Sequence, residues 1–237
     1  MFLDADALRH SAEVFGVFLD ETALARLDTY AAFLAEYNQK VNLTAITDPA
    51  GIAVKHFEDS LALLRFLELP QGCRMADVGT GAGFPGVVLL IARPDLQLTL
   101  MDSTKKKLVF LQQLLQKLDL SAAVLHTRAE DAGQNPSYRE QFDVVTARAV
   151  AELRVLAEYC LPLVKTGGQF AAMKATLIAD ERKNAAHALS VLGAKVEAQQ
   201  DYALSNGDGR SLLLVKKVSQ TSPKYPRSSA LIAKKPL

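Results

Sequence analysis

The sequence has little of what marks several large classes of protein. It holds only two cysteines, Cys73 and Cys160, which are too few for a disulfide framework and lack the spacing of a metal site. Its apolar runs are short, the longest lying around residues 87–92, so none approaches the ~20 residues that a transmembrane helix needs. Acidic residues at positions 4, 6 and 13 do not fit a secretory signal peptide. These absences predict a soluble protein of the reducing cytoplasm that binds no metal and no membrane.

Net charge is also nearly absent, at +1, but the charges are distributed unevenly. Residues 1–70 contain five basic and eleven acidic residues, whereas the rest of the chain contains 22 basic and 15 acidic residues. From Lys216 to the C-terminus there are six basic residues and no acid. Two interpretations stay open. This end either binds a polyanion, driven by counterion release, or is an ordinary solvated basic tail.

With 237 residues, 49% of them hydrophobic, the chain is long enough for one or two domains with a large core. Residues 1–70 are expected to be helical, because apolar residues recur near a 3.6-residue period from 21 to 41 and Thr47-Asp48-Pro49 is a helix start. Pro70-Gln71-Gly72 breaks the pattern. We therefore expect an N-terminal helical region (1–70) packed on a main domain (71–218), followed by a basic tail (219–237).

The main domain alternates short apolar runs with helical patterns, which predicts βαβ units and a doubly wound α/β fold with a mostly parallel, seven-stranded sheet. Residues 205–209 are too few for a helical crossover, so the last two strands should form an antiparallel hairpin at one edge. The expected strands cover residues 74–78, 97–102, 122–127, 142–147, 168–174, 196–202 and 212–218. The expected helices cover residues 85–92, 105–118, 150–161 and 178–192.

A glycine-rich stretch, DVGTGAGFPG at residues 77–86, joins the first expected strand to the first expected helix of this domain. Glycines such as Gly79 and Gly81 let the chain turn tightly and let a ligand approach the backbone closely. Pro85 suits a helix N-terminus. Because ligands of open α/β sheets bind beyond the carboxyl ends of the strands, this stretch predicts a ligand site.

Two cofactors that contain a ribose fit this site. Residues 81–86 match G-x-G-x-x-G, and Asp102 follows at the distance expected of a ribose ligand, which suits both a nicotinamide dinucleotide and S-adenosylmethionine. Three features favour S-adenosylmethionine. Asp77 would face the ammonium of a methionine, Ala129 and Glu130 would lie near an adenine edge, and the chain closes with a hairpin. A NAD(P)-dependent oxidoreductase and a non-catalytic nucleotide-binding module remain the alternatives.

Several further motifs occur together in one order along the chain. They are NQKVNLT at 38–44, HFEDS at 56–60, residues 77–86, Asp102-Ser103 with Lys106-Lys107, Arg148-Ala149, Gly167-Gly168, Lys174 and KYPR at 224–227. In this combination the sequence resembles, over essentially its whole length, the bacterial small-subunit ribosomal RNA guanine-N7 methyltransferases, also called glucose-inhibited division protein B.

The resemblance implies a class I (Rossmann-like) methyltransferase fold and transfer of a methyl group from S-adenosylmethionine to a guanine N7. The target lies in the decoding-centre loop of 16S ribosomal RNA, as RNA or in the small subunit, and we expect a monomer. The resemblance also marks Gly79, Phe84, Ala129, Glu130 and Arg148 as cofactor contacts.

The reaction needs little acid–base chemistry, because guanine N7 carries an in-plane lone pair and attacks without losing a proton. No histidine is expected at a strand end of the main domain, and the two cysteines lie where thiols are inert. We expect Arg148, which cannot act as a base, to orient the cofactor carboxylate or guanine O6. The alternative is a surface ion pair.

Four residues are candidate RNA contacts. Lys174, at the end of the fifth expected strand, would hold a phosphate, or is an ordinary exposed lysine. Lys224, Tyr225 and Arg227 are expected RNA contacts, with the Tyr225 ring stacking on a base, while residues 228–237 are unassigned.

A separate polar group lies in the N-terminal region. His56, Asp59 and Ser60 share one helix face, which predicts a hydrogen-bond network between domains with Asn42 and Thr44 in the contacting loop. The alternative is a metal or acid–base site.

Overall fold

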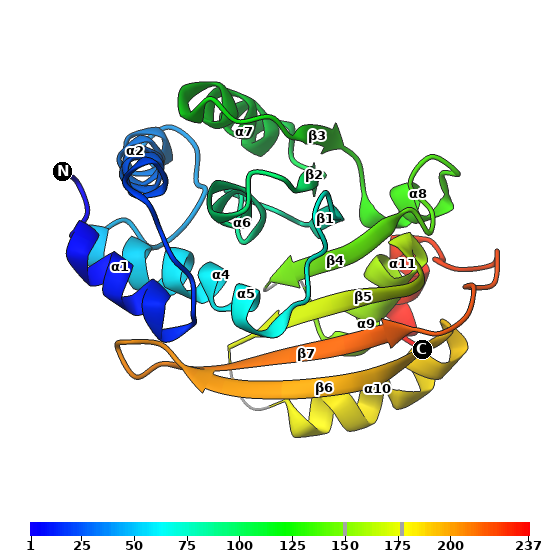
Figure 1. Ribbon diagram of the computed structural model, residues 1–237. Helices are drawn as coiled ribbons and strands as arrows, with labels where there is room; N and C mark the ends of the chain where they lie inside the picture. Colours follow the sequence, from blue (N-terminus) through cyan, green and yellow to red (C-terminus); the bar gives the residue numbers. More distant parts are fainter. Residues whose placement is uncertain (149–150, 176–177) are drawn as a thin grey trace.

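The computed structural model describes residues 1–148, 151–175 and 178–237, and its centre is one seven-stranded sheet of order β3-β2-β1-β4-β5-β7-β6 (Figure 1). The first five strands are parallel, and β7 runs antiparallel between β5 and β6. The predicted parallel sheet with an antiparallel hairpin at its edge is therefore confirmed. The strands are β1 (Arg74–Val78), β2 (Gln97–Asp102), β3 (Ala123–His126), β4 (Phe142–Arg148), β5 (Val164–Lys174), β6 (Ala194–Ala203) and β7 (Gly209–Lys217).

The strand order changes direction between β1 and β4, which places a crevice at their carboxyl ends. Both strands are buried along most of their length, with Met75, Ala76 and Val145 inaccessible to solvent. Such continuous apolar runs are typical of parallel strands that are covered on both faces. The ends of β1, β2 and β4 therefore meet at one rigid edge of the sheet.

The N-terminal region folds as helices whose starts are capped by aspartates. The Asp4, Asp20 and Asp48 carboxylates accept hydrogen bonds from the first turns of their helices, as strong N-cap residues do. The helix start predicted at residues 47–49 is confirmed. The elements are α1 (Ala5–Val14), α2 (Glu21–Asn38), α3 (Pro49–Ile52), the π-helix η1 (Ala53–Glu58), α4 (Asp59–Leu61) and α5 (Leu63–Phe66).

Helix α2 is shorter than the apolar period predicts, because it ends at Asn38 rather than near Val41. The Asn38 side chain accepts hydrogen bonds from the backbone N–H groups of Leu43 and Thr44, at 2.7 and 3.0 Å, and so replaces the helical pattern with a turn.

Helices cover both faces of the sheet (Figure 1). On one face, α6 (Gly86–Ala92) and α7 (Lys105–Leu118) share one hydrophobic core with α1 and α2, so the N-terminal region packs directly on the main domain. On the other face lie α8 (Ala129–Gln134), α9 (Leu153–Cys160), the short η2 (Leu161–Leu163) and α10 (Ala179–Val191). Ala149 and Val150, named in the sequence motifs and helices, fall outside the described residues. None of the described helices is both long and apolar enough to cross a membrane.

The last residues do not hang free. Residues 219–237, here called the C-terminal strap, return across α8 and α9 and include α11 (Ser229–Lys234), whose Ile232 is fully buried. The Arg139 guanidinium donates to backbone carbonyls of Gly133, Thr221, Ser222 and Tyr225, at 2.6–3.2 Å. The region expected to be a tail is thus an ordered part of the fold.

Candidate active site

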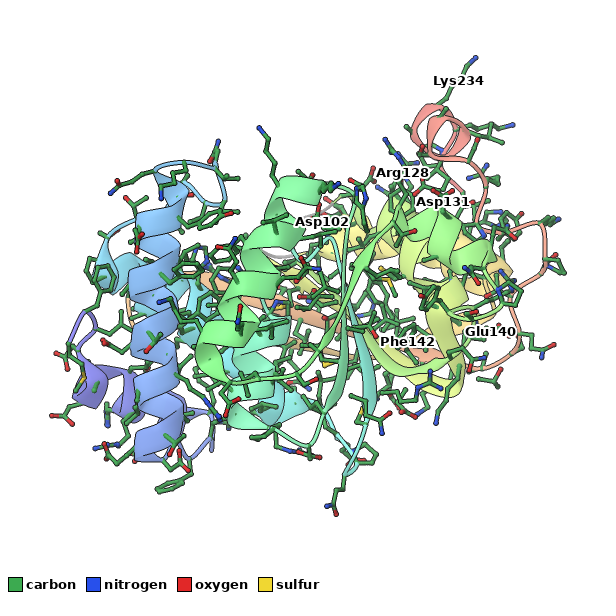
Figure 2. All side chains as sticks on the ribbon, turned by 90° about the horizontal axis from the view of Figure 1, so that it is seen from above. Asp102, Arg128, Asp131, Glu140, Phe142 and Lys234 are labelled. Carbon is green, nitrogen blue, oxygen red and sulfur yellow. The ribbon has the colours of Figure 1, made fainter. Side chains whose placement is uncertain are left out.

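A cavity of about 470 Å³, the first cavity, opens at the carboxyl ends of β1, β2 and β4. Its walls include five predicted cofactor residues from different segments, namely Gly79, Asp102, Ala129, Glu130 and Arg148. Figure 2 shows Asp102 and Arg128 toward one end of the sheet, while Glu140 and Phe142 lie toward the opposite end. The topology therefore brings these residues together although up to 69 positions separate them in sequence.

Asp102 is a buried carboxylate at the floor of the first cavity. Its Oδ2 accepts a hydrogen bond from the Gly81 N–H at 3.1 Å, and its Oδ1 accepts one from the Thr104 N–H at 2.8 Å. Each carboxylate oxygen has two lone pairs, so both keep capacity for a further donor. Asp102 thus shapes the glycine loop and suits a ligand that carries two neighbouring hydroxyl groups, such as a ribose.

The glycines of the loop serve different purposes. A Cβ at Gly81, which has φ of +59°, would have no neighbour closer than 3.9 Å, so the backbone there is open to an approaching group. A Cβ at Gly83 would lie 2.7 Å from the Tyr30 hydroxyl, and one at Gly86 would lie 2.8 Å from the Asp77 carboxylate. Gly83 thus permits tight packing of the loop on helices α2 and α7, and Gly86 permits tight packing of α6 on the sheet.

Asp77 does not face a ligand, contrary to the expectation from its place before the glycines. Its side chain is fully buried, and its Oδ2 accepts hydrogen bonds from the Thr80 hydroxyl at 2.7 Å and the Gly86 N–H at 3.0 Å. Burial raises the pKa of this carboxyl to about 6. Asp77 therefore holds the glycine loop against the start of α6 from the inside.

Phe84 is likewise buried, in a stack of rings beside the first cavity. Its ring lies between those of His56 and Tyr30, with centroid distances of 4.3 and 5.2 Å, and the Arg148 guanidinium is 5.0 Å from its centre. The Tyr30 hydroxyl donates to the Ala82 carbonyl at 2.5 Å. Phe84 and Tyr30 tie the glycine loop to α2, and a cofactor contact by Phe84 stays a prediction.

Arg148, at the end of β4, is held by the N-terminal region. Its Nη1 donates to Asp59 Oδ2 at 3.0 Å and to the Lys55 carbonyl at 3.2 Å, and its Nη2 lies 3.2 Å from His56 Nδ1. The Arg148 side chain is only 16% exposed, so the alternative of a surface ion pair does not describe it. Arg148 is a fixed, largely buried cation in the wall of the first cavity.

His56 acts in this network as a neutral acceptor. Burial, and next the charge of Arg148, lower the pKa of His56 to about 3, so at neutral pH its Nδ1 can accept from Arg148. Its Nε2 then carries the proton and donates to the Thr44 hydroxyl at 2.9 Å. The predicted packing network of His56, Asp59 and Thr44 is present, and the Ser60 hydroxyl donates to the His56 carbonyl. Over the described part of the chain no group of three or more His, Cys, Asp or Glu could hold a metal ion.

The sequence did not reveal two further members of this network. Arg210 and Tyr202, on the β6–β7 hairpin, reach Asp59 Oδ1 with distances of 3.2 Å from Nε and 3.3 Å from the hydroxyl. Asp59 thus collects donors from β4, β6 and β7. Only the strand alternation marks this hairpin in the sequence, and that pattern carries no sign of which polar side chains meet.

A second cavity, of about 640 Å³, adjoins the first and shares Arg148 and Ala151 with it. Lys174 lies in its wall, with its ammonium 2.7 Å from both the Ala151 carbonyl and the Glu181 carboxylate, and is 12% exposed. Lys174 is thus not an ordinary exposed lysine.

The other three predicted RNA contacts lie on the C-terminal strap and do not line the second cavity. Tyr225 is buried, with Lys224 and Arg227 over its ring at 5.2 and 6.0 Å. The Arg227 guanidinium is bound to Glu158. In this arrangement the ring of Tyr225 is covered and cannot stack on a base.

Neither the two thiols nor His126 is arranged to act as a nucleophile or a base. Burial raises the pKa of Cys160 well above its usual value and that of Cys73 to about 11, so neither is a thiolate at neutral pH. One expectation was wrong, because His126 does end a strand, β3. Its ring is exposed and its Nε2 lies 3.0 Å from the Ser103 carbonyl.

Solved structures share this fold. An S-adenosylmethionine-dependent O-methyltransferase from Thermotoga maritima matches with a TM-score of 0.53 and 16% identity, over 80% of this chain and 72% of that one. TrmN from Thermus thermophilus matches with a TM-score of 0.52 and 21% identity, over 67% and 48% of the two chains. The fold is therefore that of the class I methyltransferases.

Sequence comparisons are more specific. Ribosomal RNA small subunit methyltransferase G of Alkaliphilus metalliredigens is 44% identical over 232 residues, which is 97% of each protein. The protein of the same name from Lactobacillus johnsonii is 47% identical over 227 residues, 94% of this chain and 95% of that protein. Residues 23–206 match the family GidB, described as rRNA small subunit methyltransferase G. With its first cavity bounded by the glycine loop, Asp102 and Arg148, the chain belongs to the rRNA small subunit methyltransferase G family.

Proposed function

We propose that this enzyme moves the methyl group of S-adenosylmethionine to N7 of a guanine in the decoding-centre loop of 16S ribosomal RNA. Membership of the family and the class I fold support the cofactor and the RNA substrate. The single observation on which the proposed transfer to guanine rests is the position of Arg148, a fixed cation in the wall shared by the two cavities.

The first cavity fits the cofactor. Asp102 would accept hydrogen bonds from the two ribose hydroxyls with the lone pairs that Gly81 and Thr104 leave free. Ala129 and Glu130, at the start of α8, lie where the adenine edge would be read. Gly79 in the cavity wall and the open backbone at Gly81 would receive the methionine portion. Bound there, S-adenosylmethionine would supply an electrophilic methyl group: the N7 lone pair would form the new N–C bond as the C–S bond breaks, with the electrons of that bond staying on the sulfur of S-adenosylhomocysteine.

No proton has to be removed from guanine N7, so the protein needs no general base. The neutral, buried His56 and the protonated thiols agree with this. What the protein contributes is in-line positioning, for which measured effective molarities allow roughly 7–11 kcal/mol. Arg148 supplies part of it by donating a hydrogen bond to guanine O6 or to the cofactor carboxylate.

A transfer assay tests this function. The enzyme is incubated with tritium-labelled S-adenosylmethionine and ribosomal RNA from cells that lack it, and the product nucleoside is identified by mass spectrometry. We expect 7-methylguanosine, and no transfer to an RNA that carries 7-deazaguanosine at the target. A change in nicotinamide absorbance without transfer would support an oxidoreductase instead. Cofactor binding with no transfer to any RNA would support a binding module.

A further inference from the structure

The second cavity is formed where the N-terminal region meets the sheet. Its walls come from the loop before α3, from η1, from the carboxyl end of β5 and from the start of β7, with Ile46, Met173 and Ile178 as apolar faces. At about 640 Å³ it lies within the range of cavities that hold small ligands. Arg148 and Ala151 are the residues that it shares with the first cavity.

We infer that the second cavity receives the target guanine after it has turned out of the RNA, with its N7 edge directed at the first cavity. This inference rests on the proposed function. Enzymes that act on a base of a stacked nucleic acid take that base into a pocket of their own, and such a pocket needs apolar faces and a few polar groups. The second cavity has both, and it shares Arg148 and Ala151 with the first cavity.

Arg148 sets the orientation of the base. A guanidinium has five N–H groups, and over the described residues it makes three hydrogen bonds, to Asp59, His56 and the Lys55 carbonyl. Donors therefore remain for guanine O6, which neighbours N7 on the same edge of the base. A hydrogen bond from Arg148 to O6 places N7 beside the shared wall, where the methyl group would arrive.

Lys55 is the cation in this wall that suits a phosphate of the flipped nucleotide. Its side chain is 43% exposed, and its ammonium pairs with Asp208 at the long distance of 3.4 Å. Lys174, predicted from the sequence for this role, is 12% exposed and bound to Glu181 and Ala151. Removing the Lys55 ammonium leaves its backbone carbonyl in place for Arg148, so the two functions of this residue can be separated.

Two variants test the inference in the full-length enzyme. Ala175→Trp places a large ring in the second cavity from an exposed wall position, and Lys55→Ala removes the phosphate contact. Their matched controls are Ala186→Trp, on the exposed face of α10, and Lys117→Ala, near the end of α7. Transfer kinetics on ribosomal RNA and calorimetric binding of S-adenosylhomocysteine are measured for each.

We expect Ala175→Trp to lower kcat/KM for RNA at least tenfold while the Kd for S-adenosylhomocysteine changes less than twofold. Lys55→Ala should raise the KM for RNA and reduce the salt dependence of RNA binding by about one counterion, with kcat unchanged. Both controls should behave as wild type. If Ala175→Trp also loses S-adenosylhomocysteine binding, the RNA kinetics of Lys55→Ala alone test the inference.

Wild-type kinetics in Lys55→Ala, or in an Ala175→Trp variant that still binds S-adenosylhomocysteine, would overturn the inference and leave the proposed function standing. A wild-type enzyme that methylates no ribosomal RNA would instead remove the proposed function itself.

Discussion

Arg227 and Glu158 form an ion pair that joins the C-terminal strap to α9. The Arg227 Nη2 lies 2.6 Å from Glu158 Oε2, and its Nε and backbone N–H both donate to Oε1, at 2.8 and 2.9 Å. Glu158 is 0% exposed, and hydrogen bonding to it raises the pKa of Arg227. A residue expected to bind RNA is thus the counter-ion of a buried carboxylate.

Replacing Arg227 by alanine should therefore destabilise the fold. Breaking a buried pair leaves an uncompensated charge, which costs on the order of 3–5 kcal/mol in the free energy of unfolding. Urea denaturation followed by circular dichroism measures it, with Lys224→Ala, an exposed neighbour, as the control that should change little. An unchanged unfolding free energy combined with weaker RNA binding would show instead that Arg227 contacts RNA.

Tyr30→Phe should weaken cofactor binding although Tyr30 does not line the first cavity. The variant keeps the stacked rings but leaves the Ala82 carbonyl without the hydroxyl that donates to it, at a cost of about 1–3 kcal/mol. Because Ala82 belongs to the glycine loop, we expect a higher Kd for S-adenosylhomocysteine and a lower unfolding free energy. Tyr37→Phe, in the same helix, is the control. Equal Kd values for Tyr30→Phe and wild type would show that the Tyr30 hydroxyl on α2 does not influence cofactor binding.

Arg148→Lys should keep a positive charge at the end of β4 but lose the planar fork that Asp59 and His56 hold. A misplacement of about 1 Å can cost 10²-fold in rate, so we expect kcat to fall by about that factor. The Kd for S-adenosylhomocysteine should change much less. Steady-state kinetics on ribosomal RNA measure the effect, and full activity of this variant would remove the orienting role.

Asp77→Asn should change how stability depends on pH. Burial raises the pKa of Asp77 from 3.8 to about 6, so between these values the unfolded chain releases this proton and the folded protein keeps it. The contribution of Asp77 to stability is therefore present below about pH 4 and is lost as the pH rises to 6. Relative to wild type, the variant should gain on the order of 2–3 kcal/mol over this range and no more above it. Thermal unfolding between pH 4 and 8 measures the difference, and a constant difference would contradict the raised pKa.

Much of the sheet could be predicted because its signals are local. The limits of β1, β2 and α7 agree with the predicted ranges residue for residue, since each is a short apolar or amphipathic run bounded by turn residues or a charged start. The glycine loop and Asp102 were equally visible, because strand, glycines and acid follow each other at fixed distances. Their convergence on the first cavity follows from the parallel order of the strands.

The roles of Asp77, Tyr225 and Arg227 were not predictable from their neighbours in sequence. Asp77 turns inward because two donors, the Thr80 hydroxyl and the Gly86 N–H, lie behind the loop. Basic composition suggested that residues 224–227 face RNA, but Glu158, almost 70 residues earlier, draws Arg227 onto α9. Such long-range pairings leave no periodicity in the sequence.

The packing of the C-terminal strap over α8 and α9 has a consequence for how the protein folds during its synthesis. Glu158 receives its cation, and Arg139 three of its carbonyl partners, from residues that are synthesised after β7. Since domains generally fold as units during synthesis, the nascent chain can assemble its sheet early, but this side is complete only after residues 221–227 have been added. A ribosome stalled shortly after β7 would thus carry a chain with a buried carboxylate still lacking its partner.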